Sequence, residues 1–405
     1  MLEHDLAFDM EQFWIRNLVV ISFGSFLASV SFNMTNPFIP MFVQELGQTE
    51  GLATLSSVAL AASSLMSAVM APVWGSLADK HGKKVMFIRA GIGVAVTYFL
   101  MAFVQTYTQY IVLRLLNGML AGFIPACIMF IATNVPEHRV GYALGITQSA
   151  ISVGTISGPA VGGFLAALVG MRYTMALSAV IFFIGSLAAI IGAKEFALNT
   201  DKNAKTDIIG DIKSVLAIPT LRGVIFALFL VNTALTVIQP VLALFISTMS
   251  FTGDLEVVTG YAFSIIGVST AIGAPLIPML HRRFSTQKVF YYGLGLSALL
   301  SSTQGMTASV MVLGVQRFFS GFANSAVTIT ANVLATNASQ PELRGRTFGA
   351  LNGISQLGNV IGPLIGGTIG DAMGYNIPFH VGGILFLAAL ALSMASLKNV
   401  ETEAY

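Results

Sequence analysis

The chain alternates between long apolar runs and short polar stretches. A window of about 20 residues, the length that a helix needs to cross roughly 30 Å of hydrocarbon, identifies twelve apolar runs. Within them apolar and polar residues do not alternate as they do in strands. This pattern predicts an all-α polytopic membrane protein with twelve transmembrane helices. The runs cover Leu18–Phe42, Leu52–Leu77, Val85–Gln105, Tyr110–Ala132, Tyr142–Val169, Tyr173–Ala193, Val224–Ser247, Val257–Leu280, Val289–Met306, Val310–Ala335, Phe348–Ile369 and Ile377–Leu397.

The last six runs repeat landmarks of the first six. Arg114-x3-Gly118 in the fourth run matches Arg317-x3-Gly321 in the tenth at an offset of 203 residues (317 − 114). A glycine-rich stretch of the fifth run returns in the eleventh at an offset of 204 (362 − 158). The agreement predicts two pseudo-symmetric six-helix bundles, with a substrate cavity at their interface near the middle of the membrane. The two stretches are Gly154-x3-Gly158-Pro159-x2-Gly162-Gly163 and Gly358-x3-Gly362-Pro363-x2-Gly366-Gly367.

One long polar connection sets the domain boundaries. It contains a polar run from Asn199 to Lys205 and then an amphipathic piece around Ile208, Ile212 and Val215. We therefore expect an N-terminal bundle of residues 1–193, a linker of residues 194–222 and a C-terminal bundle of residues 223–405. Cationic residues fall in alternate loops, which places the linker and both termini in the cytoplasm by the positive-inside rule. These cations are Lys80, Lys83, Lys84, Arg139, Lys202, Lys205, Arg282, Arg283, Arg344 and Arg346.

Composition narrows the class of protein further. Of the 405 residues, 55% are hydrophobic and 9% are charged, whereas soluble domains carry about a quarter charged residues. The net charge of +2 is too small to indicate a nucleic-acid partner. The one cysteine, Cys127, lies in a predicted span, which excludes a disulfide framework and a thiolate metal site. No Gly-x4-Gly-Lys-Ser/Thr loop is present, so we expect a transporter without ATP hydrolysis or other enzymatic activity, cofactor or metal.

The loop between the second and third runs carries the most specific motif. Gly75 allows two helices to approach closely, Asp79 is an acid at a helix end, and Gly82 permits a sharp turn. Lys83 and Lys84 hold that turn at the cytoplasmic surface. The motif, Gly75-Ser76-Leu77-Ala78-Asp79-Lys80-His81-Gly82-Lys83-Lys84, resembles the loop signature of the major facilitator superfamily. The resemblance implies a conformational switch in which the acid faces the beginning of the eleventh span, near Arg346-Thr347-Phe348, where a helix N-terminus carries about half a positive charge.

Two further motifs indicate a branch of this superfamily. The stretch Gly154-x3-Gly158-Pro159-x2-Gly162-Gly163 resembles the antiporter motif of exporters; its small residues admit a neighbouring backbone, and Pro159 bends the helix. The run Arg114-Leu115-Leu116-Asn117-Gly118 resembles the fourth-span signature of drug:proton antiporters, in which the arginine assists proton transfer. A charge within a span costs about 2.5–3.5 kcal/mol on insertion scales. Arg114 therefore needs a cavity, a polar partner or a position near the outer surface.

The residue that would carry a coupling proton stays open. Exporters of this kind commonly have a carboxylate in the first or seventh span. In this chain the polar side chains of those two runs are all amides and hydroxyls. Arg114 and His380 are the remaining candidates for proton coupling, since an imidazole titrates near neutral pH. An interfacial histidine without function is the alternative for His380.

The candidate substrate cavity is inferred from side-chain chemistry. Methionine and phenylalanine adapt to many ligand shapes, and amides supply hydrogen bonds. The candidates are Asn33, Asn36, Phe38, Asn117, Met119, Asn232, Gln239, Phe319, Asn324, Asn352 and Gln356.

These features together predict a bacterial multidrug efflux transporter of the drug:proton antiporter branch. We expect it to act as a monomer in the cell membrane, exporting amphipathic small molecules by alternating access in exchange for protons. A lipid or glycolipid translocase on the same fold is an alternative, because an amphipathic cavity suits lipids and drugs alike. A nutrient importer is the other alternative, although the middle of the runs is sparse in charges.

Overall fold

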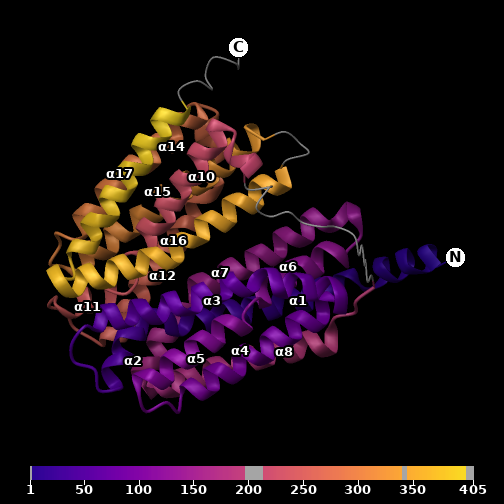
Figure 1. Ribbon diagram of the computed structural model, residues 1–405, viewed down its shortest axis with the longest axis horizontal. Coiled ribbons are helices and arrows are strands. Elements are labelled where there is room, and N and C mark those ends of the chain that lie inside the picture. Colours follow the sequence, from indigo (N-terminus) through magenta and orange to yellow (C-terminus); the bar gives the residue numbers. More distant parts are fainter. Residues whose placement is uncertain (1, 197–212, 340–343, 398–405) are drawn as a thin grey trace. The chain divides into compact units, whose positions relative to one another are not determined.

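The computed structural model describes residues 2–196, 213–339 and 344–397, with only the backbone of residues 2–10, 79 and 344–346. Within these residues every regular element is a helix (Figure 1). The first half contains α1 (Leu2–Thr35), η1 (Asn36–Phe38), α2 (Ile39–Glu45), α3 (Leu52–His81), α4 (Lys83–Met101), α5 (Tyr107–Leu120), α6 (Phe123–Thr133), η2 (Glu137–Arg139), α7 (Val140–Val169) and α8 (Met171–Gly192). The second contains α10 (Pro219–Thr236), α11 (Leu242–Ser247), α12 (Leu255–Gly273), η3 (Ala274–Leu276), α13 (Ile277–His281), α14 (Thr286–Gln304), α15 (Val310–Asn337), α16 (Arg344–Met373) and α17 (Ile377–Leu397).

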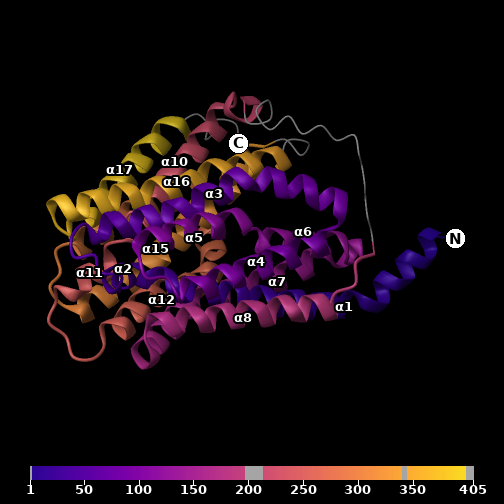
Figure 2. The same cartoon turned by 60° about the horizontal axis from the view of Figure 1, so that its bottom comes forward.

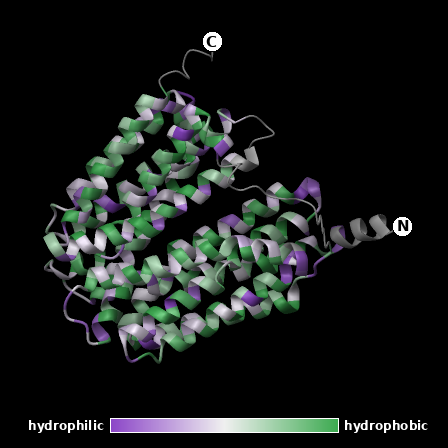
Figure 3. Cartoon of the chain, viewed as in Figure 1, coloured by the Kyte–Doolittle hydropathy of each residue, from purple (hydrophilic) through white to green (hydrophobic). Residues whose placement is uncertain are grey.

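Ten helical segments of the described chain are long and apolar enough to cross a membrane. The ninth and eleventh predicted runs correspond to α14 and α16, which are 19 and 30 residues long but more polar. On α16 the amides of Asn352, Gln356 and Asn359 recur at helical spacing and lower its hydropathy. Apolar residues dominate the length of the helices, and many of the polar residues gather at their ends (Figure 3).

The chain divides into two compact units that do not follow the predicted halves residue by residue. The first unit comprises Met1–Gly47, Ala62–Ala204 and Glu256–Ser264, and the second comprises Gln48–Ala61, Lys205–Leu255 and Ile265–Tyr405. The beginning of α3 is therefore grouped with the second unit, and the first turns of α12 with the first. The linker prediction falls partly on residues 197–212, which lie outside the described residues. Val215, from its amphipathic piece, is fully buried in the core of the second unit.

Glycines bring the helices of the first unit into backbone contact. A Cβ on Gly158 of α7 would lie 2.7 Å from the Asn33 Cβ and 2.8 Å from the Val30 carbonyl oxygen of α1. A Cβ on Gly24 of α1 would lie 3.1 Å from the carbonyl oxygen of Gly185 on α8. Both α7 and α8 therefore pack directly along α1, and Figure 2 shows α8 running beside it.

The repeated glycines do the same in the second unit. A Cβ on Gly358 of α16 would lie 2.8 Å from the Thr233 backbone nitrogen and 2.9 Å from the Asn232 Cβ of α10. Thr236 of α10 donates a hydrogen bond of 2.9 Å to the Gly358 carbonyl oxygen. In both units the glycine-rich stretch therefore brings two helices into close contact, α7 with α1 and α16 with α10.

The fourth predicted run is two helices rather than one. It breaks between α5 and α6, where Gly122 has a φ of +114°, a conformation that favours glycine. The break frees carbonyl groups, and side chains take them up: Trp74 Nε1 donates to the Met119 carbonyl oxygen at 2.7 Å and Arg89 Nη2 to that of Ala121 at 3.3 Å. The repeat counterpart α15 is continuous. In lipid such freed backbone groups need a partner, which explains these two polar side chains inside the bundle.

Candidate functional site

Arg114 lies fully inside the first unit. Its side chain is 2% exposed, and its Nη1 and Nη2 donate to Asn36 Oδ1 at 3.4 and 3.3 Å. The guanidinium carbon lies 5.9 Å from the centroid of the Tyr110 ring, and Tyr98 is also close enough to interact electrostatically. Both tyrosines are buried. Arg114 is therefore not a snorkelling surface residue: it has an amide acceptor and two aromatic neighbours within the helix bundle.

Arg317 occupies the matching place in the second unit, with different surroundings. It is 4% exposed, so it too is buried. The repeat offset of 203 pairs Tyr98 with Ser301 (301 − 98) and Tyr110 with Leu313 (313 − 110). The two phenol rings therefore have no counterpart at these positions around Arg317. The two buried arginines are equivalent in the repeat but chemically distinct.

The loop motif is held by an acid that the sequence did not single out. Glu195, just after α8, accepts hydrogen bonds from the backbone nitrogens of Lys83 at 2.7 Å and Lys84 at 3.2 Å. Gly82 has a φ of +93°, and a Cβ there would lie 2.8 Å from Glu195 Oε2. Glu195 thus caps the beginning of α4, where the helix dipole favours a negative charge. The side chain of Asp79 lies outside the described residues.

The segment around Glu195 is anchored on both sides. Asn17 of α1 is fully buried; its Oδ1 accepts from the Lys194 nitrogen at 2.8 Å, and its Nδ2 donates to the Lys194 carbonyl oxygen at 2.9 Å. Asn134, at the end of α6, accepts from the Phe196 nitrogen at 2.7 Å. The first residues of the predicted linker are therefore part of the first unit. Their signal in the sequence is weak, because an isolated Glu and Asn have no motif spacing.

Asp371, near the end of α16, caps α3 within the second unit. Its carboxylate accepts from the backbone nitrogens of Ala53 at 3.2 Å and Thr54 at 2.7 Å. Thr54 Oγ1 also donates to the Gly367 carbonyl oxygen at 3.3 Å. Burial and the charge of Asp371 together raise the pKa of Tyr375 in the following loop. The repeat partner of Asp371 at an offset of 204 (371 − 167) is Ala167, so this cap exists on one side of the repeat.

The predicted cavity residues fall into two groups. Phe38 is fully buried, and Asn117 is 1% exposed and donates to Thr97 Oγ1 at 2.8 Å, so both belong to the helix packing and we do not carry them into the proposed cavity. Asn33, Asn36, Met119, Asn232 and Asn324 are half-buried, and Gln239, Phe319, Asn352 and Gln356 are exposed. His380 is half-buried at the beginning of α17, and a Cβ on Gly305 would lie 3.1 Å from its Nε2.

Ten described helical segments that are long and apolar enough to cross a membrane define a polytopic membrane protein. The family model described as Major Facilitator Superfamily matches residues 21–303 and 224–404. The chain therefore belongs to the major facilitator superfamily, and its predicted fold of twelve transmembrane helices in two pseudo-symmetric six-helix bundles is confirmed.

The chain also resembles individual proteins of known name. It is 31% identical over 394 residues to the multidrug resistance protein MdtG of Proteus mirabilis (strain HI4320), covering 96% of this chain and 97% of that one. MdtG of Klebsiella pneumoniae (strain 342) is 31% identical over 397 residues, covering 96% of both chains.

Solved structures support the fold. The nucleoside transporter NupG has a TM-score of 0.78 at 15% identity, covering 95% of this chain and 99% of that one. A bacterial homologue of the human lysosomal transporter Spinster, in an inward-facing and occupied conformation, has a TM-score of 0.79 at 13% identity, covering 96% and 97%. Likeness at this identity concerns the fold and not the substrate.

Proposed function

We propose that the chain is a secondary active transporter that exports amphipathic small molecules, drugs among them, by alternating access and in exchange for protons. The observation that carries the export is the similarity over 96% of the chain to proteins named for multidrug resistance. The chemistry of the described spans agrees with it, since their polar side chains are mostly amides and hydroxyls. Such groups accept varied ligands, whereas dense charges would select one polar nutrient.

Substrate binding is assigned to two surfaces, each on one unit. In the first unit this surface carries Asn33, Asn36 and Met119. In the second unit, Gln239, Asn352 and Gln356 are exposed, together with the Phe319 ring. Asn232 on α10 and Asn324 on α15 are half-buried and belong to the same proposed set. Aromatic and thioether groups would hold the apolar part of a substrate, and amides its polar part.

Proton coupling is assigned to Arg114 and its neighbours. The role that we propose for its guanidinium is to bias the proton affinity of a nearby group or to hold the helices around it. Arg114 is preferred to His380 because it is buried against Asn36, Tyr98 and Tyr110. The energy would come from the membrane gradient, worth about 2.3 kcal/mol per charge per 100 mV.

The loop after α3 is proposed as the conformational switch, formed by Gly75, Asp79, Gly82, Lys83 and Lys84. Its support is the cap that Glu195 places on the Lys83 and Lys84 nitrogens. The same proposal puts the protein in the bacterial inner membrane as a monomer with both termini in the cytoplasm. The basic loops support that orientation.

Efflux of ethidium from proteoliposomes, with and without an imposed pH gradient, tests the function. We expect the gradient to drive ethidium against its concentration, and a protonophore to abolish the movement. Accumulation of a single nutrient with no movement of ethidium would make the protein an importer. Movement of a fluorescent phospholipid between leaflets, with ethidium unmoved, would make it a lipid translocase.

A further inference from the structure

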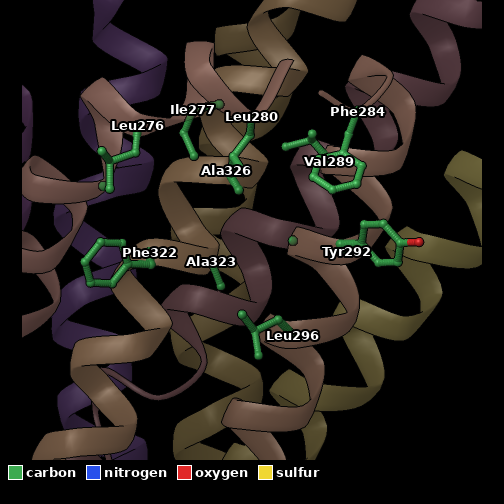
Figure 4. Close-up of a pocket in the computed structure, with 12 residues that line it drawn as sticks. Leu276, Ile277, Leu280, Phe284, Val289, Tyr292, Leu296, Phe322, Ala323 and Ala326 are labelled. Carbon is green, nitrogen blue, oxygen red and sulfur yellow. The ribbon is translucent and has the colours of Figure 1, made fainter. Parts of the chain in front are cut away.

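The second unit has an apolar groove that the transport proposal does not use. It encloses about 280 Å³ and is lined by α13, α14 and α15 and by the end of α12 (Figure 4). Phe284 and Val289 gather at one end, and Leu296 lies at the other (Figure 4). Large apolar side chains on its rim are exposed, among them Leu280 and Tyr292.

Helix-breaking and small residues create the groove. Pro275 and Pro278 interrupt the eighth span, which becomes α12, η3 and α13. The small residues Ala323 and Ala326 of α15 leave the space that larger side chains would fill. Gly293 of α14 lets the two helices approach, since a Cβ there would lie 3.1 Å from Val327 Cγ2. The hollow is thus encoded by specific positions.

The matching place in the first unit carries two large side chains in contact. The repeat offset of 203 pairs Ile277 with Trp74 (277 − 74) and Tyr292 with Arg89 (292 − 89). In the first unit, the Arg89 guanidinium carbon lies 3.5 Å from the centroid of the Trp74 ring, and both side chains bond to carbonyls at the α5/α6 break. The groove therefore depends on side chains that differ between the two halves, and not on the shared fold alone.

The lining suits a hydrocarbon chain better than a drug. Ligand pockets usually hold about 300–1,000 Å³ and include a few polar groups that orient the ligand. Of the twelve side chains and glycines that line this groove, Tyr292 alone has a polar side-chain atom, and its hydroxyl points away from the other labelled residues (Figure 4).

Three cations flank the Phe284 end of the groove. Arg282 and Arg283 lie in the turn between Leu280 and Phe284, and Lys288 directly precedes Val289. All three are exposed, and no carboxylate in the described parts of the chain forms a salt bridge with them. The neighbouring His281 instead shares a hydrogen bond of 3.1 Å with Thr330 Oγ1. An anionic lipid has an apolar acyl chain and a negatively charged headgroup. The apolar groove suits the acyl chain, and the basic groups beside it suit the headgroup.

We propose that this groove binds an anionic phospholipid, with one acyl chain in the groove and the phosphate headgroup on Arg282, Arg283 and Lys288. The site is independent of the transport proposal, because none of its residues belongs to the candidate substrate or proton sites.

Quenching by brominated lipid tests the site. Leu296→Trp places an indole in the groove, and Leu299→Trp, an exposed position on the same helix outside the groove lining, is the matched control. Both variants are reconstituted with phosphatidylglycerol or phosphatidylcholine brominated on the acyl chain; the native Trp14 and Trp74 are common to all samples. We expect phosphatidylglycerol to bind about fivefold or more tightly than phosphatidylcholine at Leu296→Trp, given the attraction of several cations, and about equally at Leu299→Trp.

Further variants test separately the cations that would bind the headgroup and the groove that would bind the acyl chain. Replacing Arg282, Arg283 and Lys288 together with Gln should bring the preference at Leu296→Trp down to that of the control, while replacing the two arginines with Lys should keep it. Ala323→Phe, which fills the groove, should reduce quenching by both lipids. Equal quenching by both lipids at Leu296→Trp, or a preference that survives the Gln substitutions, would overturn the proposal. So would displacement of the brominated lipid by ethidium, because the groove would then belong to the transported compounds.

Discussion

Arg114 and Arg317 occupy matching positions of the two repeats, and only Arg114 has two tyrosines beside it at the repeat-related positions. Asn36 accepts from both terminal nitrogens of Arg114, and its repeat partner at an offset of 203 (239 − 36), Gln239, is exposed. Because the amide of Asn36 and a phenol ring lie beside the guanidinium of Arg114, our proposal assigns proton coupling to Arg114 and not to Arg317.

Arg114→Ala should lower pH-driven ethidium efflux by roughly tenfold or more and leave the protein folded, since a hydrogen bond to a charged group contributes about 1.5–3 kcal/mol. Arg114→Lys should keep partial efflux with a shifted pH dependence, because lysine retains the charge but not the planar fork. Efflux is measured in proteoliposomes across a series of pH values.

Arg317→Ala and Arg317→Lys are the matched controls, and we expect milder effects on the pH dependence. Wild-type efflux and pH dependence in purified Arg114→Ala would reduce Arg114 to a structural residue. The antiport proposal would then rest on similarity to other proteins alone.

Glu195 lies outside the loop motif, and its carboxylate accepts hydrogen bonds from two backbone nitrogens of that motif. Glu195→Ala should lower the free energy of unfolding by about 1 kcal/mol, because it removes the acceptor for two backbone nitrogens at the beginning of α4. Glu195→Gln should have a smaller effect. The exposed Glu137 is the control: Glu137→Gln should leave stability unchanged. An unaltered melting temperature for Glu195→Ala would show that the cap contributes nothing.

At the scale of elements, glycine spacing decides which helices touch. On α7, Gly158 faces α1, while a Cβ on Gly145 would meet nothing within 4 Å. The same contrast holds on α16 between Gly358, which faces α10, and Gly353, whose Cβ would also meet nothing within 4 Å. One helix therefore carries both packing glycines and open ones.

Gly158→Ala should destabilise the protein by about 1–3 kcal/mol, because the added methyl group forces α1 and α7 apart. Gly145→Ala should be neutral or stabilise by up to about 1 kcal/mol, since alanine favours a helix where no neighbour interferes. Cys127 is fully buried, so its labelling by a fluorogenic maleimide during heating reports unfolding directly. Equal melting temperatures for the two variants would contradict the packing role of Gly158.

The sequence predicted the positions of most helices, but it predicted fewer of the breaks within the spans. Pro37 and Pro275 mark breaks in the first and eighth spans. The break between α5 and α6 was missed, because its Gly122 is one of 40 glycines in the chain and most of these lie inside helices. Trp74 and Arg89, which bond to the freed carbonyls, were missed with it.

At the scale of the whole molecule, α3 connects the two units, since its first residues are grouped with the second unit and the rest with the first. Asp371 holds that beginning through two backbone hydrogen bonds. In the repeat, α12 begins at Leu255, and the side chain of its N-cap residue Asp254 makes no capping hydrogen bond. The two halves therefore begin their second helices differently.

Asp371→Ala should weaken this contact between α16 and α3 by about 1 kcal/mol. A loss of that size changes about fivefold the equilibrium between conformations that keep the contact and conformations that break it. We expect a several-fold change in ethidium turnover with little change in ethidium affinity, because Asp371 is not among the proposed substrate residues. Binding and efflux are measured on the same purified variant. Asp254→Ala is the control and should behave like wild type. A loss of affinity equal to the loss of turnover would place Asp371 at the substrate instead.

The sequence by itself determined the membrane class and the repeat. Lipid forces each span to satisfy its backbone hydrogen bonds within its own helix, so the spans leave a local record in the chain. Tertiary structure decided which polar groups meet. The bonds of Arg114 to Asn36, of Glu195 to Lys83 and of Asp371 to Ala53 join residues 78, 112 and 318 apart. No local pattern encodes such pairs, because each depends on how whole helices pack. The same packing forms the groove beside Ala323 and, at the matching place of the first half, stacks Arg89 on Trp74.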